Sequence, residues 1–114
     1  MNNLELVKLI PSNLLKSFSL LGVRDDVSEI MKAIDILCVT SSWGEGFPNV
    51  IGESMATGVF CISTDVGDSR YIIDSTGKIV PANNNEALYR AMNDVANMTN
   101  EDRKIAGNES RKRV

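Results

Sequence analysis

Histidine is absent from the 114-residue sequence, and cysteine occurs only at Cys38 and Cys61. Without histidine, a His-based general base or a Ser-His-Asp triad within the chain is excluded. The two cysteines form no CxxC pair, and each lies inside a short apolar run, where cysteine behaves as a small hydrophobic residue. A zinc site is therefore not expected, and we predict no metal ligands in this chain.

Long apolar runs and an excess of positive charge are also missing. No stretch reaches the roughly 18 residues that span a bilayer, and no signal peptide is visible, so a reducing cytoplasm is the expected compartment. The net charge of −3 offers no broad basic surface, and we predict no nucleic-acid partner. The basic residues 111–113 are interpreted as a solvated helix end.

The apolar pattern predicts strands that alternate with helices. Buried strands are expected at 36–40, 59–63 and 78–80, with a further strand at 18–22. Helices are expected near 4–10, 26–34, 48–57, 68–73 and 86–96, followed by a weakly apolar last helix, capped by Thr99 or Asn100, that could project past the core. This alternation indicates βαβ units, and the predicted fold class is α/β, a Rossmann-like parallel sheet flanked by helices.

Three turns follow predicted strands, at residues 22–26, 41–49 and 64–69. In parallel α/β sheets, ligands bind beyond the carboxyl ends of the strands. All three turns are therefore expected to open on one edge of the sheet, and this edge is the candidate binding site.

The middle turn is rich in glycine and runs into a helix. Gly44 and Gly46 allow a backbone to approach a ligand closely, and a helix N-terminus suits phosphate. The dinucleotide fingerprint GxGxxG is incomplete because Asn49 stands where the third glycine belongs, and no Gly-Lys-Ser/Thr follows. Phosphate binding at this turn is therefore one hypothesis among others.

Two carboxylates flank the same turn. Glu53, about one helical turn into the helix, is suited to accept hydrogen bonds from a ribose diol, each worth about 1.5–3 kcal/mol to a charged acceptor. Glu45 precedes the helix, where it could bind sugar hydroxyls or stabilise positive charge developing at an anomeric carbon. The alternative is that both acids face solvent and interact only with the helix dipole.

The segment from Glu45 to Ala56 resembles the Glu-x7-Glu signature of retaining GT-B glycosyltransferases, glycosyltransferase family 4 in particular. Residues 20–27, 33–36, 64–73 and 77–81 resemble neighbouring segments of that family in the same order, and the match covers roughly residues 18–97. The resemblance implies the C-terminal half of a GT-B fold, truncated. Residues 1–114 would then form a single partial nucleotide-sugar-binding domain, with the acceptor domain absent.

The resemblance also implies roles for individual residues. Glu53 is expected to hold the ribose diol of the donor, and Glu45 to face the donor sugar as the catalytic residue. Arg24 and Asp25 are expected beside the nucleobase, largely through backbone and packing contacts. The residues expected to bind the sugar and the distal phosphate, through backbone amides, are Gly46, Phe47, Pro48, Asn49 and Val50. The donor is a substrate, and no cofactor or metal is implied.

The activity implied is transfer of a hexose from a nucleoside-diphosphate sugar to a glycan or lipid-linked acceptor, with retention of configuration. Polysaccharide biosynthesis is the expected process, and the full-length enzyme could sit peripherally at the inner membrane. Relatives carry an Arg and a Lys that neutralise the departing pyrophosphate, and nothing in residues 1–17 matches them. The chain alone is therefore expected to be inactive as a transferase.

Two alternative functions remain open at this point. A nucleotide-sugar epimerase of GT-B architecture would use the same donor site with acid–base residues from elsewhere. A non-catalytic nucleotide-binding module would use the same sheet edge without chemistry. Exposed edge strands also make self-association of the chain plausible.

Overall fold

The computed structural model describes residues 7–43 and 49–114. Residues 7–9 are helical, and they lie in the segment where the first helix is expected. The two short 3-10 helices of the described chain are called η1 and η2. In chain order, the elements are η1 (Ser12–Ser17), α2 (Val27–Ala33), β1 (Ile36–Val39), α3 (Asn49–Ala56), β2 (Phe60–Thr64), α4 (Ser69–Ile73), η2 (Asp74–Thr76), β3 (Lys78–Val80), α5 (Asn85–Ala96) and α6 (Asn100–Arg113).

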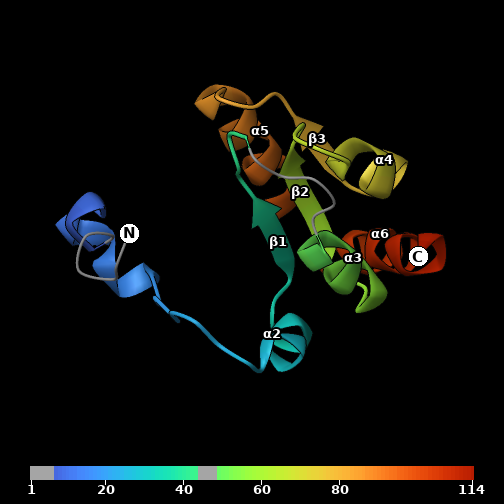
Figure 1. The fold of residues 1–114 in the computed structure, drawn as a ribbon, viewed down its shortest axis with the longest axis horizontal. Helices are drawn as coiled ribbons and strands as arrows, with labels where there is room; N and C mark the ends of the chain where they lie inside the picture. The colour runs from blue at the N-terminus through green and yellow to red at the C-terminus, as the bar shows by residue number, and fades with distance from the viewer. Residues whose placement is uncertain (1–6, 44–48) are drawn as a thin grey trace.

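The three strands form one parallel sheet in the order β1-β2-β3. Cys38 is in register with Ile62, and Ser63 with Ile79. All five residues of the central strand β2 are buried, which agrees with its continuous apolar character. The predicted α/β class, a parallel sheet flanked by helices, is confirmed (Figure 1).

A separate apolar cluster covers each face of the sheet. Successive β2 side chains point to opposite faces, so Cys61 belongs to one cluster and Ile62 to the other. The first cluster joins β2 to α3 and α4 through Ile51, Met55, Cys61, Ile72 and Ile73. The second joins the sheet to α5 through Phe60, Ile62, Val80, Ala91 and Val95. The sheet thus holds α3 and α5 on opposite sides.

The last helix, α6, packs against α3, η2 and β2, so the expectation that it could project past the core is wrong. Its buried residues are Gly107 and Ser110, which are small rather than apolar. Gly107 lies directly against the backbone of Gly58, at the end of α3. The Ser110 hydroxyl lies 3.2 Å from the carbonyl oxygen of Thr76 and 3.1 Å from that of Ala106. The packing of α6 therefore depends on the close approach of its backbone to that of Gly58 rather than on an apolar stripe.

The end of α6 also anchors the end of α4. Arg113 donates from Nε to the carbonyl oxygen of Ile72 at 2.8 Å and from Nη2 to that of Tyr71 at 2.6 Å. Its guanidinium lies 5.9 Å from the centre of the Tyr71 ring. These bonds satisfy carbonyls that the short helix leaves without intrahelical partners. The interpretation of residues 111–113 as a purely solvated helix end is therefore wrong for Arg113.

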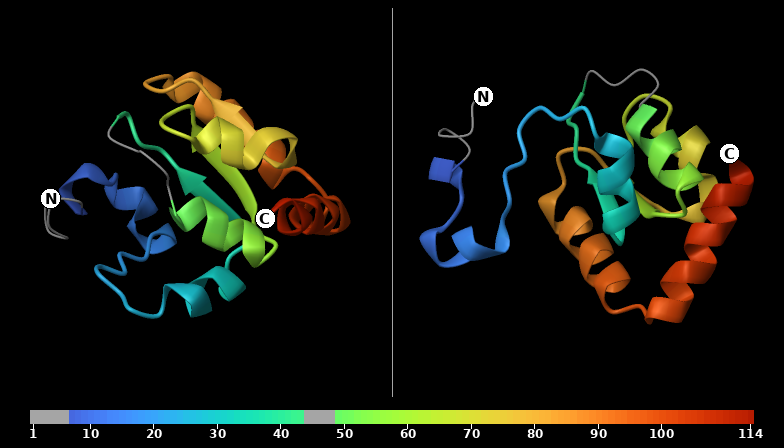
Figure 2. Two further views of the ribbon diagram at one scale, coloured as in Figure 1. Left: turned by 45° about the vertical axis from the view of Figure 1, so that its right-hand side comes forward. Right: turned by 90° about the horizontal axis from the view of Figure 1, so that it is seen from below.

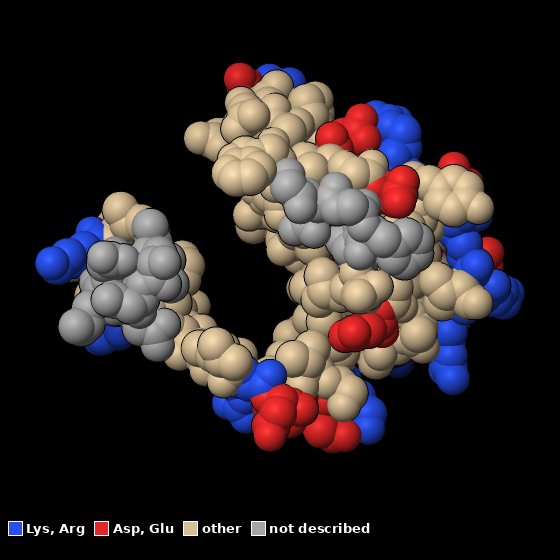
Figure 3. Space-filling view, in the orientation of Figure 1, with Lys and Arg blue, Asp and Glu red and all other residues tan. Residues whose placement is uncertain are grey.

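Residues 7–25 form an N-terminal arm that stands apart from the rest of the molecule, across from β1 (Figures 1 and 3). Every residue from 11 to 25 is exposed. The strand expected at Phe18–Gly22 is absent: Phe18 has extended dihedral angles (φ −111°, ψ 140°), but in the described part of the chain this segment pairs with no other strand. The prediction was wrong because an apolar β pattern becomes a strand only when a partner supplies the hydrogen bonds.

Candidate functional site

The turns that follow β1 and β2 lie together at the carboxyl edge of the sheet, where these parallel strands end at Val39 and Thr64. In the right-hand view of Figure 2, the start of α3 lies at the top of the molecule. The candidate site is therefore located where parallel sheets bind ligands. The predicted turn at 22–26 follows no strand, and Figure 1 shows the segment that enters α2 at the bottom of the molecule, away from the arrowhead of β1.

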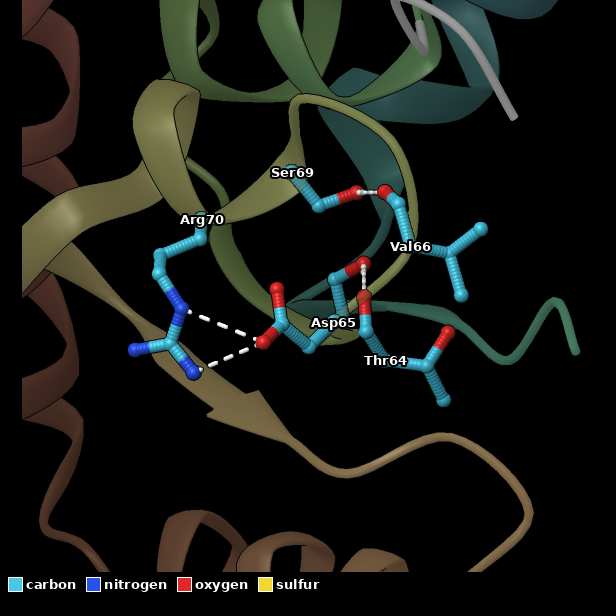
Figure 4. A network of polar contacts seen from close by, with 6 residues as sticks. Thr64, Asp65, Val66, Ser69 and Arg70 are labelled. Atoms are coloured by element: carbon cyan, nitrogen blue, oxygen red, sulfur yellow. Dashed lines mark hydrogen bonds and ion pairs between the residues drawn. The ribbon is translucent and has the colours of Figure 1, made fainter. Parts of the chain in front are cut away.

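A hydrogen bond joins the turns that follow β1 and β2. Thr64, at the end of β2, is only 4% exposed, and its hydroxyl donates to the carbonyl oxygen of Ser41 at 2.6 Å. The turn after β2 is fixed in addition by Ser69, whose hydroxyl donates to the Val66 carbonyl at 2.9 Å (Figure 4). The Asp65 amide donates to the carbonyl oxygen of Val80 in β3 at 2.8 Å. The edge is thus braced across all three strands.

Replacing Thr64 with valine tests this brace. Thr64→Val keeps the shape of the side chain but removes the donor to Ser41, so we expect a loss of about 1 kcal/mol in the free energy of unfolding. Urea unfolding measures this loss. Thr64→Ser keeps the hydroxyl and is the matched control. A Thr64→Val variant as stable as the unmodified chain would show that the bond contributes nothing to stability.

An ion pair lies at the rim of the same turn. Arg70 donates to Asp65 Oδ2 from Nε at 3.2 Å and from Nη2 at 2.8 Å (Figure 4). The hydrogen bonds to Asp65 raise the pKa of Arg70 above its ordinary value. Asp68 occupies the N-cap position of α4 without a side-chain capping bond. Arg70 is thus committed to Asp65 and serves the structure of the turn.

Glu53 lies on the exposed side of α3. The buried residues of this helix are Ile51, Ser54 and Met55, at the spacing of one helical face. The Ser54 hydroxyl donates to the Ile51 carbonyl at 2.8 Å and lies 2.7 Å from the sulfur of Cys61. Glu53 falls on the opposite side and faces solvent. Its position in the helix places it roughly 6 Å along the axis from the first residue.

The end of α3 fixes the orientation of the helix. Gly58 has a φ of +81°, and its amide donates to the Met55 carbonyl at 2.9 Å. The amide of Val59 donates to the Ser54 carbonyl at 2.9 Å, which completes a Schellman motif. The predicted helix end at Gly58 is confirmed. The chain thereby turns directly into β2, which begins at Phe60.

The other predicted donor-site residues are only partly covered by the structure. Asn49 is the exposed first residue of α3, and the half-buried Val50 packs against the first apolar cluster. Four predicted residues lie outside the described part of the chain: Glu45, Gly46, Phe47 and Pro48. The roles assigned to them stay predictions.

Arg24 and Asp25 are exposed in the segment that enters α2. Arg24 binds both carboxylate oxygens of Asp26, from Nε at 2.7 Å and from Nη2 at 2.6 Å. This pairing lowers the pKa of Asp26 and raises that of Arg24. Asp26 occupies the N-cap position of α2, but its side chain makes no capping hydrogen bond to the helix. The Arg24 guanidinium is committed locally, which leaves backbone and packing contacts for a ligand.

A polar pocket of about 220 Å³, which sequence reasoning missed, lies at the carboxyl edge on the α5 side of the sheet. Asn84 caps α5 by accepting from the Ala87 amide at 2.9 Å, and Asn83 has a positive φ of 57°. The only sequence signal was the run of three asparagines, interpreted as a turn and cap. The pocket is lined by Thr40, Ser42, Thr64, Asn83, Asn84, Asn85 and Leu88.

No three His, Cys, Asp or Glu side chains within residues 7–43 and 49–114 gather closely enough to hold a metal ion. Among the same residues, no helix has the length and apolar character needed to cross a bilayer. Burial raises the pKa of both thiols, Cys38 and Cys61, which makes them weaker nucleophiles at neutral pH.

Known proteins resemble this chain in sequence and in fold. The chain is 31% identical over 94 residues to the UDP-Gal:alpha-D-GlcNAc-diphosphoundecaprenol alpha-1,3-galactosyltransferase of Escherichia coli, an alignment that covers 81% of this chain and 24% of that enzyme. The crystal structure of HepE from Anabaena in complex with UDP superposes with a TM-score of 0.82 at 25% identity, over 96% of this chain and 31% of HepE. The chain thus spans about a quarter to a third of these proteins.

A family-level match agrees with both similarities. Residues 2–98, most of the chain, match the sequence model of the family described as glycosyl transferases group 1. The resemblance to GT-B glycosyltransferases is confirmed by this match and by the fold shared with HepE. The chain therefore belongs to the glycosyl transferases group 1 family.

Proposed function

We propose that this chain is the donor-binding part of a glycosyltransferase and that it binds a uridine-diphosphate sugar at the carboxyl edge of its sheet. The observation that carries the proposal is the exposed carboxylate of Glu53 in α3, the helix that lies between β1 and β2 in the chain. The UDP complex of HepE and the UDP-galactose donor in the name of the Escherichia coli relative support a uridine nucleotide.

In the proposed donor site, a carboxylate binds the ribose of the nucleotide sugar and backbone amides bind its distal phosphate. The Glu53 carboxylate accepts hydrogen bonds from the ribose hydroxyls, because no ion pair or hydrogen bond within the described residues occupies that carboxylate. The N-terminal amides of α3, beginning at Asn49, attract the distal phosphate through the positive end of the helix dipole. Glu45 then faces the donor sugar as the catalytic residue.

The reaction proposed for the whole enzyme is transfer of a hexose to a glycan or lipid-linked acceptor with retention of configuration, in polysaccharide biosynthesis. The diphosphoundecaprenol-linked acceptor in the name of the relative supports a lipid-linked acceptor. Neither a cofactor nor a metal is part of the proposal. Glu45 would stabilise the positive charge that develops at the anomeric carbon as its bond to the β-phosphate oxygen breaks and UDP leaves.

Sugar transfer by the 114-residue chain alone is not expected. The departing diphosphate needs cationic partners, and the arginines of two predicted turns, Arg24 and Arg70, are paired with Asp26 and Asp65. Incubation with UDP-galactose and UDP-glucose, with product detection by mass spectrometry, is the measurement. Turnover above the rate of spontaneous hydrolysis would contradict this expectation.

Calorimetric titration with UDP, GDP and ADP tests the proposed site. We expect UDP to bind, with GDP and ADP weaker by at least about tenfold, a difference of roughly 1.4 kcal/mol. Circular dichroism in the same buffer establishes that the chain is folded. A folded chain that binds none of the three nucleotides would refute the donor site, and a preference for GDP or ADP would refute a uridine donor.

A further inference from the structure

Within the described part of the chain, β1 forms an open edge of the sheet. Among the described residues, β1 pairs only with β2, so the hydrogen-bonding groups of Ile36–Val39 that point away from β2 have no strand to meet. An apolar groove of about 500 Å³ lies beside this edge, on the α5 side of the sheet. It is lined by Ile36, Cys38, Ile62, Tyr89, Met92, Asn93 and Ala96. An open edge beside an apolar groove is the arrangement that binds an added strand.

The N-terminal arm carries apolar side chains without cover. Eight of the fourteen exposed large apolar residues in the described chain lie between residues 7 and 23: Val7, Leu9, Leu14, Leu15, Phe18, Leu20, Leu21 and Val23. Figure 3 shows the arm separated from the body by an open hollow. Exposed apolar residues concentrated in this way mark an interaction surface.

The arm and the body also differ in charge. Residues 7–25, which form the arm, contain three basic residues, Lys8, Lys16 and Arg24, and one acidic residue, Asp25, which gives a formal charge of +2. Residues 26–114 contain thirteen acidic and nine basic residues, which gives a formal charge of −4. Attraction between a cationic arm and an anionic body favours their association and orients the encounter.

We propose that the β1 edge and its groove bind the arm of a second copy of this chain. The segment Phe18–Leu21, which has the pattern of a strand and the extended dihedral angles of one at Phe18, adds to β1 and places alternate side chains in the groove. Reciprocal exchange covers both arms and both grooves around a two-fold axis. The α5-side groove lies on the sheet face opposite α3, so Glu53 stays open to a nucleotide.

Mass measurement with a matched pair of variants is the first test. Multi-angle light scattering after gel filtration is expected to give twice the monomer mass of 12.5 kDa. Met92, 44% exposed in the groove, is changed to glutamate, and we expect the dimer dissociation constant to rise at least tenfold. Ile105→Glu, at an apolar residue of α6 that is 56% exposed, is the control and is expected to leave the constant unchanged.

Thiol cross-linking then distinguishes exchange from docking within one chain. Phe18→Cys is combined with the native Cys38 of the groove, and copper phenanthroline oxidises the two thiols to a disulfide. We expect a covalent dimer on a denaturing gel, and its loss when Cys38 is also changed to serine. This readout reports the position of the arm directly and does not depend on the stability of the Met92 variant.

Each alternative result overturns the proposal. A monomer throughout the micromolar range excludes the second copy, and an intramolecular disulfide shows that the arm folds onto its own groove. A dimer equally sensitive to Met92→Glu and Ile105→Glu, or insensitive to both, places the interface elsewhere. A monomer that binds vesicles of phosphatidylglycerol through the arm assigns the exposed apolar residues to a membrane surface.

Discussion

Glu53→Gln is expected to weaken the binding of UDP by about 10- to 150-fold. The substitution keeps the size of the side chain but removes the negative charge, and hydrogen bonds to a charged acceptor contribute about 1.5–3 kcal/mol. Glu53 is exposed and on the side of α3 opposite the buried Ile51, Ser54 and Met55, so the fold is expected to remain unchanged. Calorimetric titration with UDP gives the affinity, and urea unfolding gives the stability.

The matched control for this prediction is Glu101→Gln. Glu101 is also an exposed helical glutamate, but it lies in the first turn of α6. The neighbouring Asn100 shares a pocket with Asp35, just before β1, and therefore lies at the opposite end of the sheet from the candidate site. The control is expected to bind UDP like the unmodified chain. Equal affinities for the two variants would remove Glu53 from the donor site.

Gly107→Ala is expected to lower the free energy of unfolding by about 2 kcal/mol. A Cβ at this position would lie 2.0 Å from the carbonyl oxygen of Gly58 and 3.0 Å from its carbonyl carbon. Both atoms belong to the backbone of a Schellman turn, so either the turn or α6 must shift. Overpacking of this kind costs about 1–3 kcal/mol and occasionally more, and the better helix propensity of alanine offsets about 1 kcal/mol of it.

Gly52→Ala provides the opposite expectation within the same fold. Gly52 lies inside α3, and a Cβ built there meets nothing within 4 Å. The alanine variant is therefore expected to gain up to about 1 kcal/mol from helix propensity alone. Urea unfolding of both variants measures the contrast. If Gly107→Ala were as stable as Gly52→Ala, the close contact between α6 and Gly58 would not exist in solution.

Local sequence patterns predicted the elements that depend on a continuous apolar run or on contacts between residues close in sequence. The apolar run around Leu37 and the one around Cys61 formed adjacent parallel strands, and Gly58 ended α3 with the positive φ that glycine adopts readily. Asn84 and Thr99 cap their helices through bonds to amides three residues ahead. Each of these features depends on residues close in sequence or on a buried apolar segment.

Features that depend on distant residues were not predictable in this way. The strand expected at Phe18–Gly22 lacks a partner, and the Asp26 carboxylate binds Arg24 in place of the helix amides. Arg113 reaches carbonyls more than forty residues earlier in the chain, which no local pattern encodes. The packing of α6 was missed because Gly107 and Ser110 carry no apolar signal.

The same limit applies to the candidate site. The sequence left open whether Glu53 binds a ligand or only faces solvent, and the structure places it on the face of α3 opposite the buried Ile51, Ser54 and Met55. The bond between Thr64 and Ser41 was not predictable, because it links the ends of two strands that are 23 residues apart. The sequence therefore suggested a carboxylate for the proposed site but gave no sign of the bond between the turns after β1 and β2.

The packing of α6 against the end of α3 has a consequence for genetic screens. The helix that carries Glu53 is held at its far end by Gly58 and Gly107, on the side away from the binding edge. A screen for variants that lose nucleotide binding should therefore recover positions in α6 as well as positions in the turns. A stabilising osmolyte such as trimethylamine N-oxide would separate the two groups, because it restores binding to variants with a loosened fold but not to variants that lack a ligand contact.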